Sequence, residues 1–183
     1  MMQAFEKYGI LLRRMAEGDL DLVREQRNRP EVMCHMTTQH VITPEEMLNW
    51  FRTLPDNYYY WMVEWRGQIV GQVSMKVDDA GVGTSGIILW NNDFQEECGA
   101  LRASMANFYY FYEVLGGRRV CGLVAMSNKR ALRLFKAMEG NLDGERRKLD
   151  GKEYLVSDCD TEWYYKVLRK WRNVLSSFEK ETV

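Results

Sequence analysis

The segment from residue 84 to residue 138 decides the fold of this chain, because it alternates strand and helix twice. It contains the apolar run GIILWNN (86–92), the polar turn DFQEECGA (93–100) and the helical stretch LRASMANFYYFYEVLG (101–116). The strand RRVCGLVAMSN (118–128) follows and runs directly into the helix NKRALRLFKAME (128–139). A strand that ends at a helix N-terminus presents free backbone N–H groups and a positive dipole end. The segment therefore predicts a strand–turn–helix unit suited to binding phosphate.

The flanking sequence completes an α/β domain. Hydrophobic periodicity, caps and turn signals predict the remaining elements. They are a strand at 9–15, helices at 19–28 and 44–54, a hairpin of strands at 58–65 and 68–77, a polar loop at 77–86, two short strands around Asp150-Gly151, and a C-terminal helix at about 161–180. Because no linker or repeat divides the chain, residues 1–183 are expected to form one domain with a mixed, mostly antiparallel sheet.

Composition excludes several classes of function. The chain has 183 residues, 46% hydrophobic and 28% charged, with a formal net charge of −1, so a general affinity for nucleic acid is not expected. No apolar run is long enough for a membrane span, and the N-terminus carries charges inside its apolar stretch. The four cysteines are scattered and only two histidines occur, which favours free thiols, no metal site and a cytoplasmic location.

Three short motifs give this order of elements a family resemblance. Asn128-Lys129-Arg130-Ala131, continuing to Leu134-Phe135-Lys136, resembles the N-x-x-A-x-x-L-Y-x-K segment of the GCN5-related N-acetyltransferase (GNAT) superfamily. Residues 95–100 occupy the position of that family's Q/R-x-x-G-x-G/A acyl-CoA turn. The stretch EQRNRPEV (25–32) is similar to the W-R-N-x-P-x-V segment of two GNAT branches, the ribosomal-protein N-acetyltransferases and the enzymes that acetylate nucleotide-linked amino sugars.

The resemblance implies a GNAT fold whose fourth and fifth strands splay apart around the pantetheine arm of acetyl-CoA, with helices on both faces of a twisted sheet. Backbone N–H groups near Leu89 and Trp90 would contact pantetheine or the acetyl carbonyl. The turn would hold the pyrophosphate, and Asn128 would contact the cofactor or position a water near the amine. The residues of the turn are Gln95, Glu96, Glu97, Cys98, Gly99 and Ala100.

The sequence departs from the family pattern at two places. Cys98 stands where a glycine is usual. Glycine suits such a turn because it adopts positive φ without strain. Glu96 and Glu97 stand where cations would help bind a diphosphate. On the last predicted helix before the terminal hairpin, Phe135 and Ala131 replace the tyrosine or serine that would protonate the thiolate. Water, or a tyrosine at 109, 110 or 112, remains as the proton donor.

Several polar and aromatic residues are candidates for the acceptor site, each with a structural alternative. Arg27 and Asn28 either bind substrate or close the first helix and tether the next loop. His35 and His40 either deprotonate the amine or pack at the surface. The strand residue Glu64 either binds the amine as a catalytic carboxylate or is an ordinary exposed side chain. Trp50, with Tyr58, Tyr59, Trp61 and Trp65, forms either an aromatic groove for a sugar or base, or part of the core.

These observations predict an acetyl-CoA-dependent N-acetyltransferase that acts directly on a primary amine of a small molecule. The resemblance favours a nucleotide-linked amino sugar, and the continuation through Met33 and Met36 to the Thr-Pro-Glu-Glu helix fits that branch. One alternative is acetylation of a protein or peptide N-terminus. Another is a GNAT-fold binding or regulatory module without catalysis. The C-terminal helix is expected to pack against the domain or form a homodimer.

Overall fold

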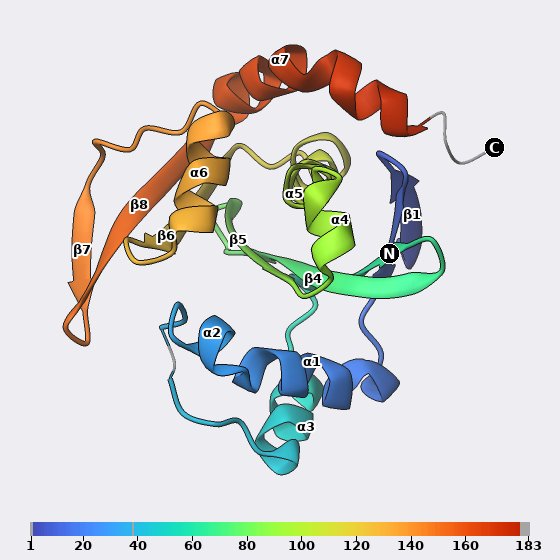
Figure 1. Ribbon diagram of the computed structural model, residues 1–183, viewed down its shortest axis with the longest axis vertical. Coiled ribbons are helices and arrows are strands. Elements are labelled where there is room, and N and C mark those ends of the chain that lie inside the picture. Colours follow the sequence, from blue (N-terminus) through green and yellow to red (C-terminus); the bar gives the residue numbers. More distant parts are fainter. Residues whose placement is uncertain (1, 38, 180–183) are drawn as a thin grey trace.

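A computed structural model describes residues 2–37 and 39–179 and shows a single open sheet between two layers of helices (Figure 1). The eight strands lie in the order β1-β2-β3-β4-β5-β6-β8-β7. Their bounds are β1 Ala4–Lys7, β2 Ile10–Arg14, β3 Tyr58–Trp65, β4 Gln68–Val77, β5 Val82–Leu89, β6 Arg119–Ala125, β7 Arg146–Leu149 and β8 Lys152–Asp160. Every neighbouring pair is antiparallel except β5 and β6, which confirms the mixed, mostly antiparallel sheet.

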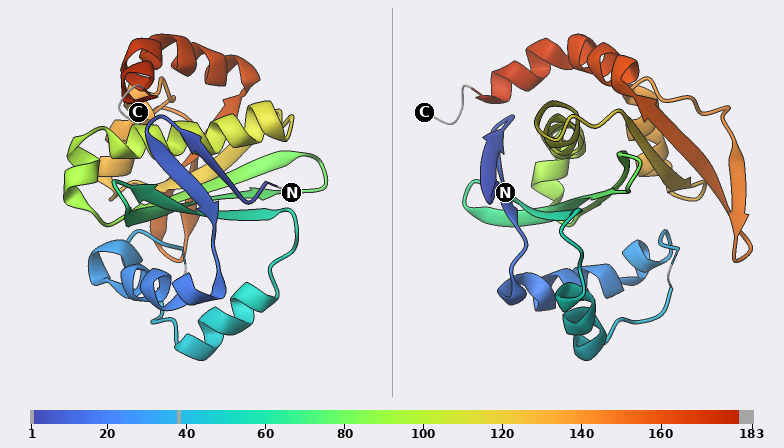
Figure 2. Two further views of the ribbon diagram at one scale, coloured as in Figure 1. Left: turned by 90° about the vertical axis from the view of Figure 1, so that its right-hand side faces the viewer. Right: turned by 180° about the vertical axis from the view of Figure 1, so that it is seen from behind.

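The helices cover both faces of this sheet. Figure 2 shows α1, α2 and α3 on one side and α5 and α7 on the other. The helices are α1 Leu20–Asn28, α2 Pro30–Met33, α3 Pro44–Arg52, α4 Asn92–Glu96, α5 Gly99–Tyr109, α6 Lys129–Ala137 and α7 Thr161–Glu179. A 3₁₀ turn at Glu17–Asp19 precedes α1, and a π-helical turn at Tyr110–Val114 extends α5. The predicted end of the last helix at residue 180 lies outside the described residues.

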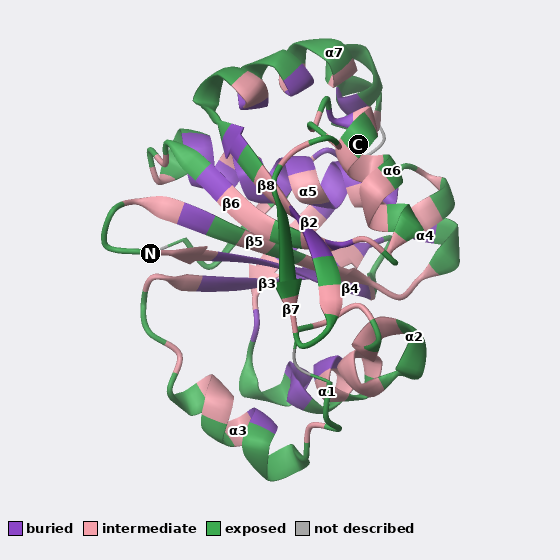
Figure 3. Cartoon of the chain, turned by 90° about the vertical axis from the view of Figure 1, so that its left-hand side faces the viewer, coloured by how far each residue is buried: buried purple, intermediate pink, exposed green. Residues whose placement is uncertain are grey.

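Two cores hold the layers together, one on each face of the sheet. Alternation along β3 separates them, because Trp61 and Val63 point into the larger core under α5 and α7 while Met62 points into the smaller core under α1 and α3. Helix α5 is the most deeply buried helix, as the purple ribbon in Figure 3 shows. It therefore forms a rigid base for whatever its N-terminus binds.

The sequence prediction fails in two places near the centre of the sheet. The segment at 77–86 is not all loop, because β5 begins at Val82. Gly81 is a turn residue with φ 74°, but the other two glycines of the segment serve close packing. A Cβ on Gly83 would lie 2.7 Å from the Met75 sulfur, and one on Gly86 would lie 2.7 Å from Ser74 Oγ. The turn at 93–100 is also partly helical, since Asn91 accepts a hydrogen bond from Phe94 N and begins α4.

The parallel pair β5 and β6 is only partly joined. Pairing covers Val82 with Arg119, Gly83 with Val120, and Thr84 with Cys121. Beyond Thr84, β5 continues to Leu89 paired only with β4, while β6 continues to Ala125 paired only with β8. The two strands therefore diverge toward their C-terminal ends, as the resemblance predicted for the fourth and fifth strands of the fold.

Candidate active site

A cleft of about 480 Å³ opens where β5 and β6 diverge. Strand β5 and the start of α5 form one wall, the N-terminal half of α6 forms the other, and the segment at 29–36 borders the rim. The lining residues are Arg29, Glu31, Val32, His35, Met36, Ile87, Ile88, Leu89, Trp90, Asn92, Gln95, Ala100, Asn128, Lys129, Arg130, Ala131 and Leu134. Two helix N-termini thus meet at one elongated cleft, an arrangement that suits an anionic ligand.

The turn that starts α5 takes the backbone shape that a glycine would give. Cys98 precedes the helix in the left-handed region, with φ 58° and ψ 23°. Gly99 follows, and a Cβ there would collide with the carbonyl and ring of Phe94. The substitution of cysteine for glycine therefore keeps the turn and adds strain of about 1 kcal/mol or more.

The carboxylates of the same turn do not line the cleft. Glu96 is exposed, and Glu97 forms an ion pair with Arg66 at 3.2 Å. The Glu97 backbone carbonyl also accepts a hydrogen bond from the buried Arg102. Of the six predicted turn residues, only Gln95 and Ala100 are among the residues that line the cleft. The repulsion expected between Glu97 and a diphosphate is therefore reduced by its cationic partner.

The start of α6 is built differently. Asn128 Oδ1 accepts a hydrogen bond from Ala131 N at 3.0 Å, so its side chain caps the N-terminus of α6. Lys129 and Arg130 follow as exposed cations on the cleft wall. Arg130 Nη1 donates to Gln95 Oε1 at 2.8 Å and thereby connects the two walls. Positive charge that the acyl-CoA turn lacks is supplied from this second helix.

The backbone directly after β5 departs from the prediction at Trp90. Leu89 and Trp90 both line the cleft. However, Trp90 N donates to the Val70 carbonyl at 3.1 Å, so it is wrong to expect this N–H to contact pantetheine. The Leu89 carbonyl accepts a hydrogen bond from Gln95 Nε2 at 3.3 Å. The Trp90 indole N–H donates to the Ile69 carbonyl and holds the ring in place at the cleft wall.

Among the predicted acceptor residues, the structure brings only His35 to the cleft. Its Nδ1 lies 3.2 Å from Ser127 Oγ, in the turn between β6 and α6. Asn28 instead exchanges two hydrogen bonds of 2.8 Å with the backbone of Ile42, which is the tethering alternative. Arg27 is half-buried on α1, where burial lowers the pKa of its guanidinium. His40 lies 3.5 Å from Glu46 at the surface and does not line the cleft.

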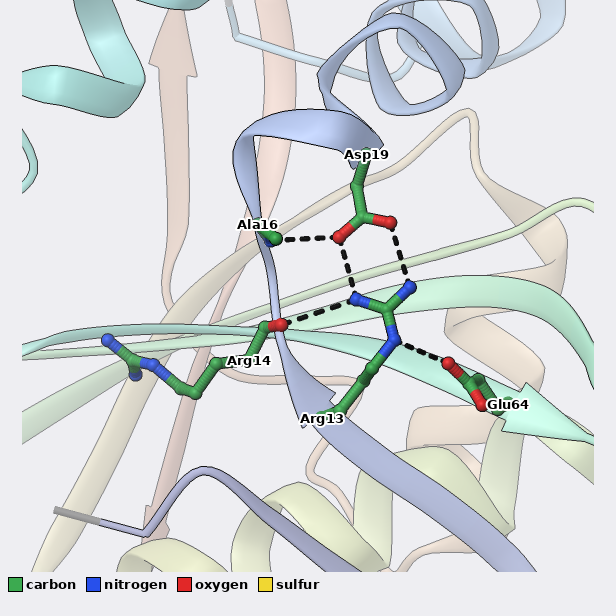
Figure 4. Close-up of polar contacts among 5 residues, drawn as sticks. All are labelled: Arg13, Arg14, Ala16, Asp19 and Glu64. Carbon is green, nitrogen blue, oxygen red and sulfur yellow. Dashed lines mark hydrogen bonds and ion pairs between the residues drawn. The ribbon is translucent and has the colours of Figure 1, made fainter.

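Glu64 lies on β3, outside the lining of the cleft, and belongs to an ion-pair network (Figure 4). Arg13 Nε donates to its carboxylate, and both Arg13 Nη atoms bind Asp19 at 2.7 and 2.8 Å. The Arg13 guanidinium also lowers the pKa of Asp19. Because the Arg13 guanidinium already binds this carboxylate, the geometry favours a structural role for Glu64.

The predicted aromatic groove is part of the two cores. Trp50 packs edge-on against Tyr60 with ring centroids 4.8 Å apart, and it lies in the smaller core. Tyr59, Trp61 and Trp65 belong to the larger core. A different tryptophan, Trp90, provides the aromatic surface at the cleft.

No substitute for the missing tyrosine of α6 is found on α5. Tyr110 and Tyr112 are buried in the larger core, and Tyr112 donates its hydroxyl to the Cys159 carbonyl. Burial raises the pKa of both phenols. Tyr109 lies next to Lys7 of β1, away from the cleft. The three tyrosines that the sequence left open as proton donors therefore do not line the cleft.

The sequence reasoning missed most of the cleft wall. Lys129, Arg130 and Ala131 stood in a quoted motif but were not assigned to the cofactor. Ile87 and Ile88 carried a signal as an apolar pair at the end of a strand. The lining residues from the segment at 29–36 reach the cleft because that segment runs along its rim, and no local sequence pattern shows this path.

Further negative findings hold for residues 2–37 and 39–179 only. Within these ranges no group of three or more His, Cys, Asp or Glu side chains is placed to hold a metal ion. None of the helices described there combines the length and apolarity needed to cross a membrane.

A partly joined parallel pair, with a cleft between two helix N-termini, defines an α/β protein of the acyl-transfer type. The sequence model of the acetyltransferase (GNAT) domain matches residues 10–140. The chain therefore belongs to the acetyltransferase (GNAT) domain family, a family of enzymes. No curated protein sequence matches the chain significantly.

Solved structures share the fold at low sequence identity. The spermidine N-acetyltransferase from Vibrio cholerae, in complex with CoA and spermine, is 16% identical with a TM-score of 0.75 over 86% of this chain and 98% of that one. The aminoglycoside acetyltransferase AAC(6')-Ib in complex with coenzyme A is 16% identical, with a TM-score of 0.71 over 86% and 98%. An acetyltransferase from T. thermophilus is 19% identical, with a TM-score of 0.72 over 100% and 98%.

Proposed function

We propose that this protein transfers an acetyl group from acetyl-CoA to the primary amine of a nucleotide-linked amino sugar. The observation that carries the proposal is the cleft between β5 and β6, whose open end is flanked by the starts of α5 and α6. An extended thiol-bearing arm fits between the diverging strands, and its diphosphate meets two helix N-termini. Two of the similar structures contain CoA, which supports this cofactor.

The residues present fit acetyl-CoA at both ends of the cleft. Lys129 and Arg130 would contact the phosphates, while the N–H groups at the start of α5 would add partial positive charge. Ile87, Leu89 and Leu134 provide apolar contacts for the pantetheine arm. Bound there, the cofactor supplies an activated acetyl group, and the chain supplies position and charge.

The charges at the cleft favour an anionic acceptor over a polycation. Glu31 is the only carboxylate in the described lining, and it is bound by Arg29. Spermine and aminoglycosides carry several positive charges, so a site for them needs carboxylates without a cation partner. A sugar nucleotide also needs a surface on which its base can stack, and Trp90 offers one at this cleft, while Lys129 and Arg130 serve the cofactor phosphates. The continuation of the 25–32 motif through Met33 and Met36 to the Thr-Pro-Glu-Glu helix resembles the amino-sugar branch and supports the same acceptor.

Calorimetry with acetyl-CoA, followed by an acceptor panel, tests the proposal. The panel contains a UDP-linked amino sugar with a free amine, a peptide with a free N-terminus, spermidine and kanamycin, and thiol release is measured. We expect binding of acetyl-CoA and the highest kcat/KM with the sugar nucleotide. Preferential turnover of the peptide would instead establish the N-terminal acetyltransferase alternative. Absence of both heat and thermal shift at millimolar acetyl-CoA would contradict the proposed acetyl transfer and leave the binding-module alternative.

A further inference from the structure

None of the described side chains that line the cleft carries a hydroxyl to protonate the departing thiolate, yet one lining residue, His35, contacts a serine that directly precedes the cleft wall. Phe135 and Ala131 carry no hydroxyl, and the tyrosines of α5 do not line the cleft. His35 extends from the segment after α2 to Ser127, with Nδ1 and Oγ 3.2 Å apart. Ser127 directly precedes Asn128, whose side chain caps α6 beside the cleft.

The position of His35 is fixed from both sides. The carbonyl of Cys34 accepts a hydrogen bond from Lys152 Nζ at 2.9 Å, and the carbonyl of Met36 accepts one from Tyr154 OH at 3.4 Å. Both donors lie on β8. Tyr154 pairs in register with Ala125, two residues before Ser127. The same strand therefore places both the histidine and the serine, which reduces the freedom that a loop histidine would otherwise have.

We propose that His35 and Ser127 form the proton relay of acetyl transfer, a role that rests on the function proposed above. His35 Nδ1 carries a proton and donates it to Ser127 Oγ, which leaves Nε2 free as a base. The amine nitrogen of the acceptor attacks the thioester carbonyl, forms the C–N bond and passes one proton to His35 Nε2. As the C–S bond breaks, Ser127 Oγ–H protonates the sulfur and receives the Nδ1 proton in exchange.

The proton count balances without another reactant. One proton leaves the amine and one arrives on the thiol of CoA, while Ser127 is unchanged. His35 ends with its proton on Nε2 instead of Nδ1, and exchange with water restores the first tautomer because the pair is open to solvent. One pair thus supplies both the base and the acid that the reaction needs.

The other titratable groups near the cleft are already engaged. Glu31 is bound by Arg29, and Arg130 is bound to Gln95. Lys129 is assigned to the cofactor phosphates under the proposed function. Of the described residues that line the cleft, His35 is the one whose side chain has two ring nitrogens, one able to donate a proton and the other able to accept one.

Three variants test the relay: His35→Gln, Ser127→Ala and the double variant. Acetyl transfer from acetyl-CoA is followed by thiol release, with the UDP-linked amino sugar or the most active member of the panel as acceptor. We expect kcat to fall by about 100-fold in each single variant, within the range usual for losing acid–base catalysis. The double variant should be no slower than the slower single variant, because residues of one relay act as a unit.

Two further readouts separate catalysis from structure. The acidic limb of the kcat/KM profile should disappear in His35→Gln, while acetyl-CoA still binds by calorimetry. Cys34→Ser serves as the matched control, since only the backbone carbonyl of Cys34 binds Lys152. It should keep the wild-type rate and pH profile.

Retention of more than a third of kcat in His35→Gln with an unchanged pH profile would overturn the relay, as would multiplicative losses in the double variant. If the wild type binds no acetyl-CoA and acetylates nothing, the proposed function fails and the relay with it. If the wild type is active and the relay variants match it, the function stands and the relay alone is wrong.

Discussion

The two helix N-termini that flank the cleft have different chemistry. At the start of α5, the left-handed Cys98 precedes Gly99, and the carboxylate of Glu97 is paired with Arg66. At the start of α6, a side-chain cap from Asn128 precedes two exposed cations. The first N-terminus offers backbone N–H groups in a fixed shape, whereas the second offers positive charge on exposed side chains.

This difference shows how a binding function can survive loss of sequence pattern. The backbone geometry at the start of α5 depends more on the buried Arg102 below the turn than on which residue stands at position 98. Arg102, only 1% exposed, donates to the Tyr8 and Gly9 carbonyls at 2.9 Å and to the Glu97 carbonyl at 3.4 Å. The positive charge is carried by side chains of α6, whose backbone has ordinary helical geometry. The comparison therefore predicts separable effects on stability and on cofactor affinity.

The largest effect is expected from Arg102→Met. The variant removes donors from three backbone carbonyls and the cation that lies over the Phe178 ring at 4.2 Å. Unfolding in urea should show a loss of about 3 kcal/mol, because buried carbonyls lose charged partners. Arg66→Met is the control, since this exposed arginine also binds Glu97 and should change stability by less than about 0.5 kcal/mol. Equal losses would show that the α5 turn does not depend on its buried support.

A smaller effect, on affinity alone, is expected from the double variant Lys129→Gln/Arg130→Gln. Each cation is expected to contact a cofactor phosphate, so calorimetry should show acetyl-CoA binding weakened by about 10- to 30-fold, or about 1.4–2 kcal/mol. Both side chains are exposed, so stability should be nearly unchanged. Arg133→Gln, an exposed cation of α6 outside the cleft lining, is the matched control and should bind normally. Unchanged affinity in the double variant would place the phosphates at the α5 turn instead.

The sequence predicted the fold well because its signals are local. The capping box at Thr43 and Glu46 forms as predicted, with hydrogen bonds of 2.8 and 3.2 Å. The hairpin at 58–77 also has the predicted bounds. The β5 error arose because Gly83 and Gly86 were interpreted as turn residues, while their role is to admit Met75 and Ser74 from the neighbouring strand. Such packing between strands is not visible in a local pattern.

The candidate site was less predictable than the fold. The sequence offered Asn128 and the α5 turn as cofactor-binding residues, and of these the structure places Asn128, Gln95 and Ala100 in the cleft lining. It offered Glu64 as a catalytic candidate, but the pairing of β2 with β3 brings Arg13 to that carboxylate. It gave His35 no partner, since Ser127 lies 92 residues further along the chain. Contacts over such separations follow from the fold as a whole.

A third prediction separates the cap of α6 from the charge beside it. Asn128→Ala removes the acceptor for Ala131 N and should lower the free energy of unfolding by about 1 kcal/mol. Asn128→Asp keeps an oxygen at the cap and should retain wild-type stability. Because it places a negative charge where the cofactor phosphates are expected, it should weaken acetyl-CoA binding several-fold. If Asn128→Asp binds as tightly as the wild type, the phosphates do not approach this helix.

The smallest effect is expected from restoring the family's glycine with Cys98→Gly. Relief of the left-handed strain at φ 58° favours the folded state by about 1 kcal/mol, but glycine also gains entropy in the unfolded chain. The net change in unfolding free energy should be within about 0.5 kcal/mol, and acetyl-CoA affinity should be unchanged. Cys98→Val is the contrast, because a β-branched residue tolerates positive φ poorly and should destabilise the turn measurably. A large gain in affinity for Cys98→Gly would mean that the cysteine side chain, and not the backbone shape, limits the α5 site. In that case the two helix N-termini would differ in access to the cofactor, instead of dividing shape and charge between them.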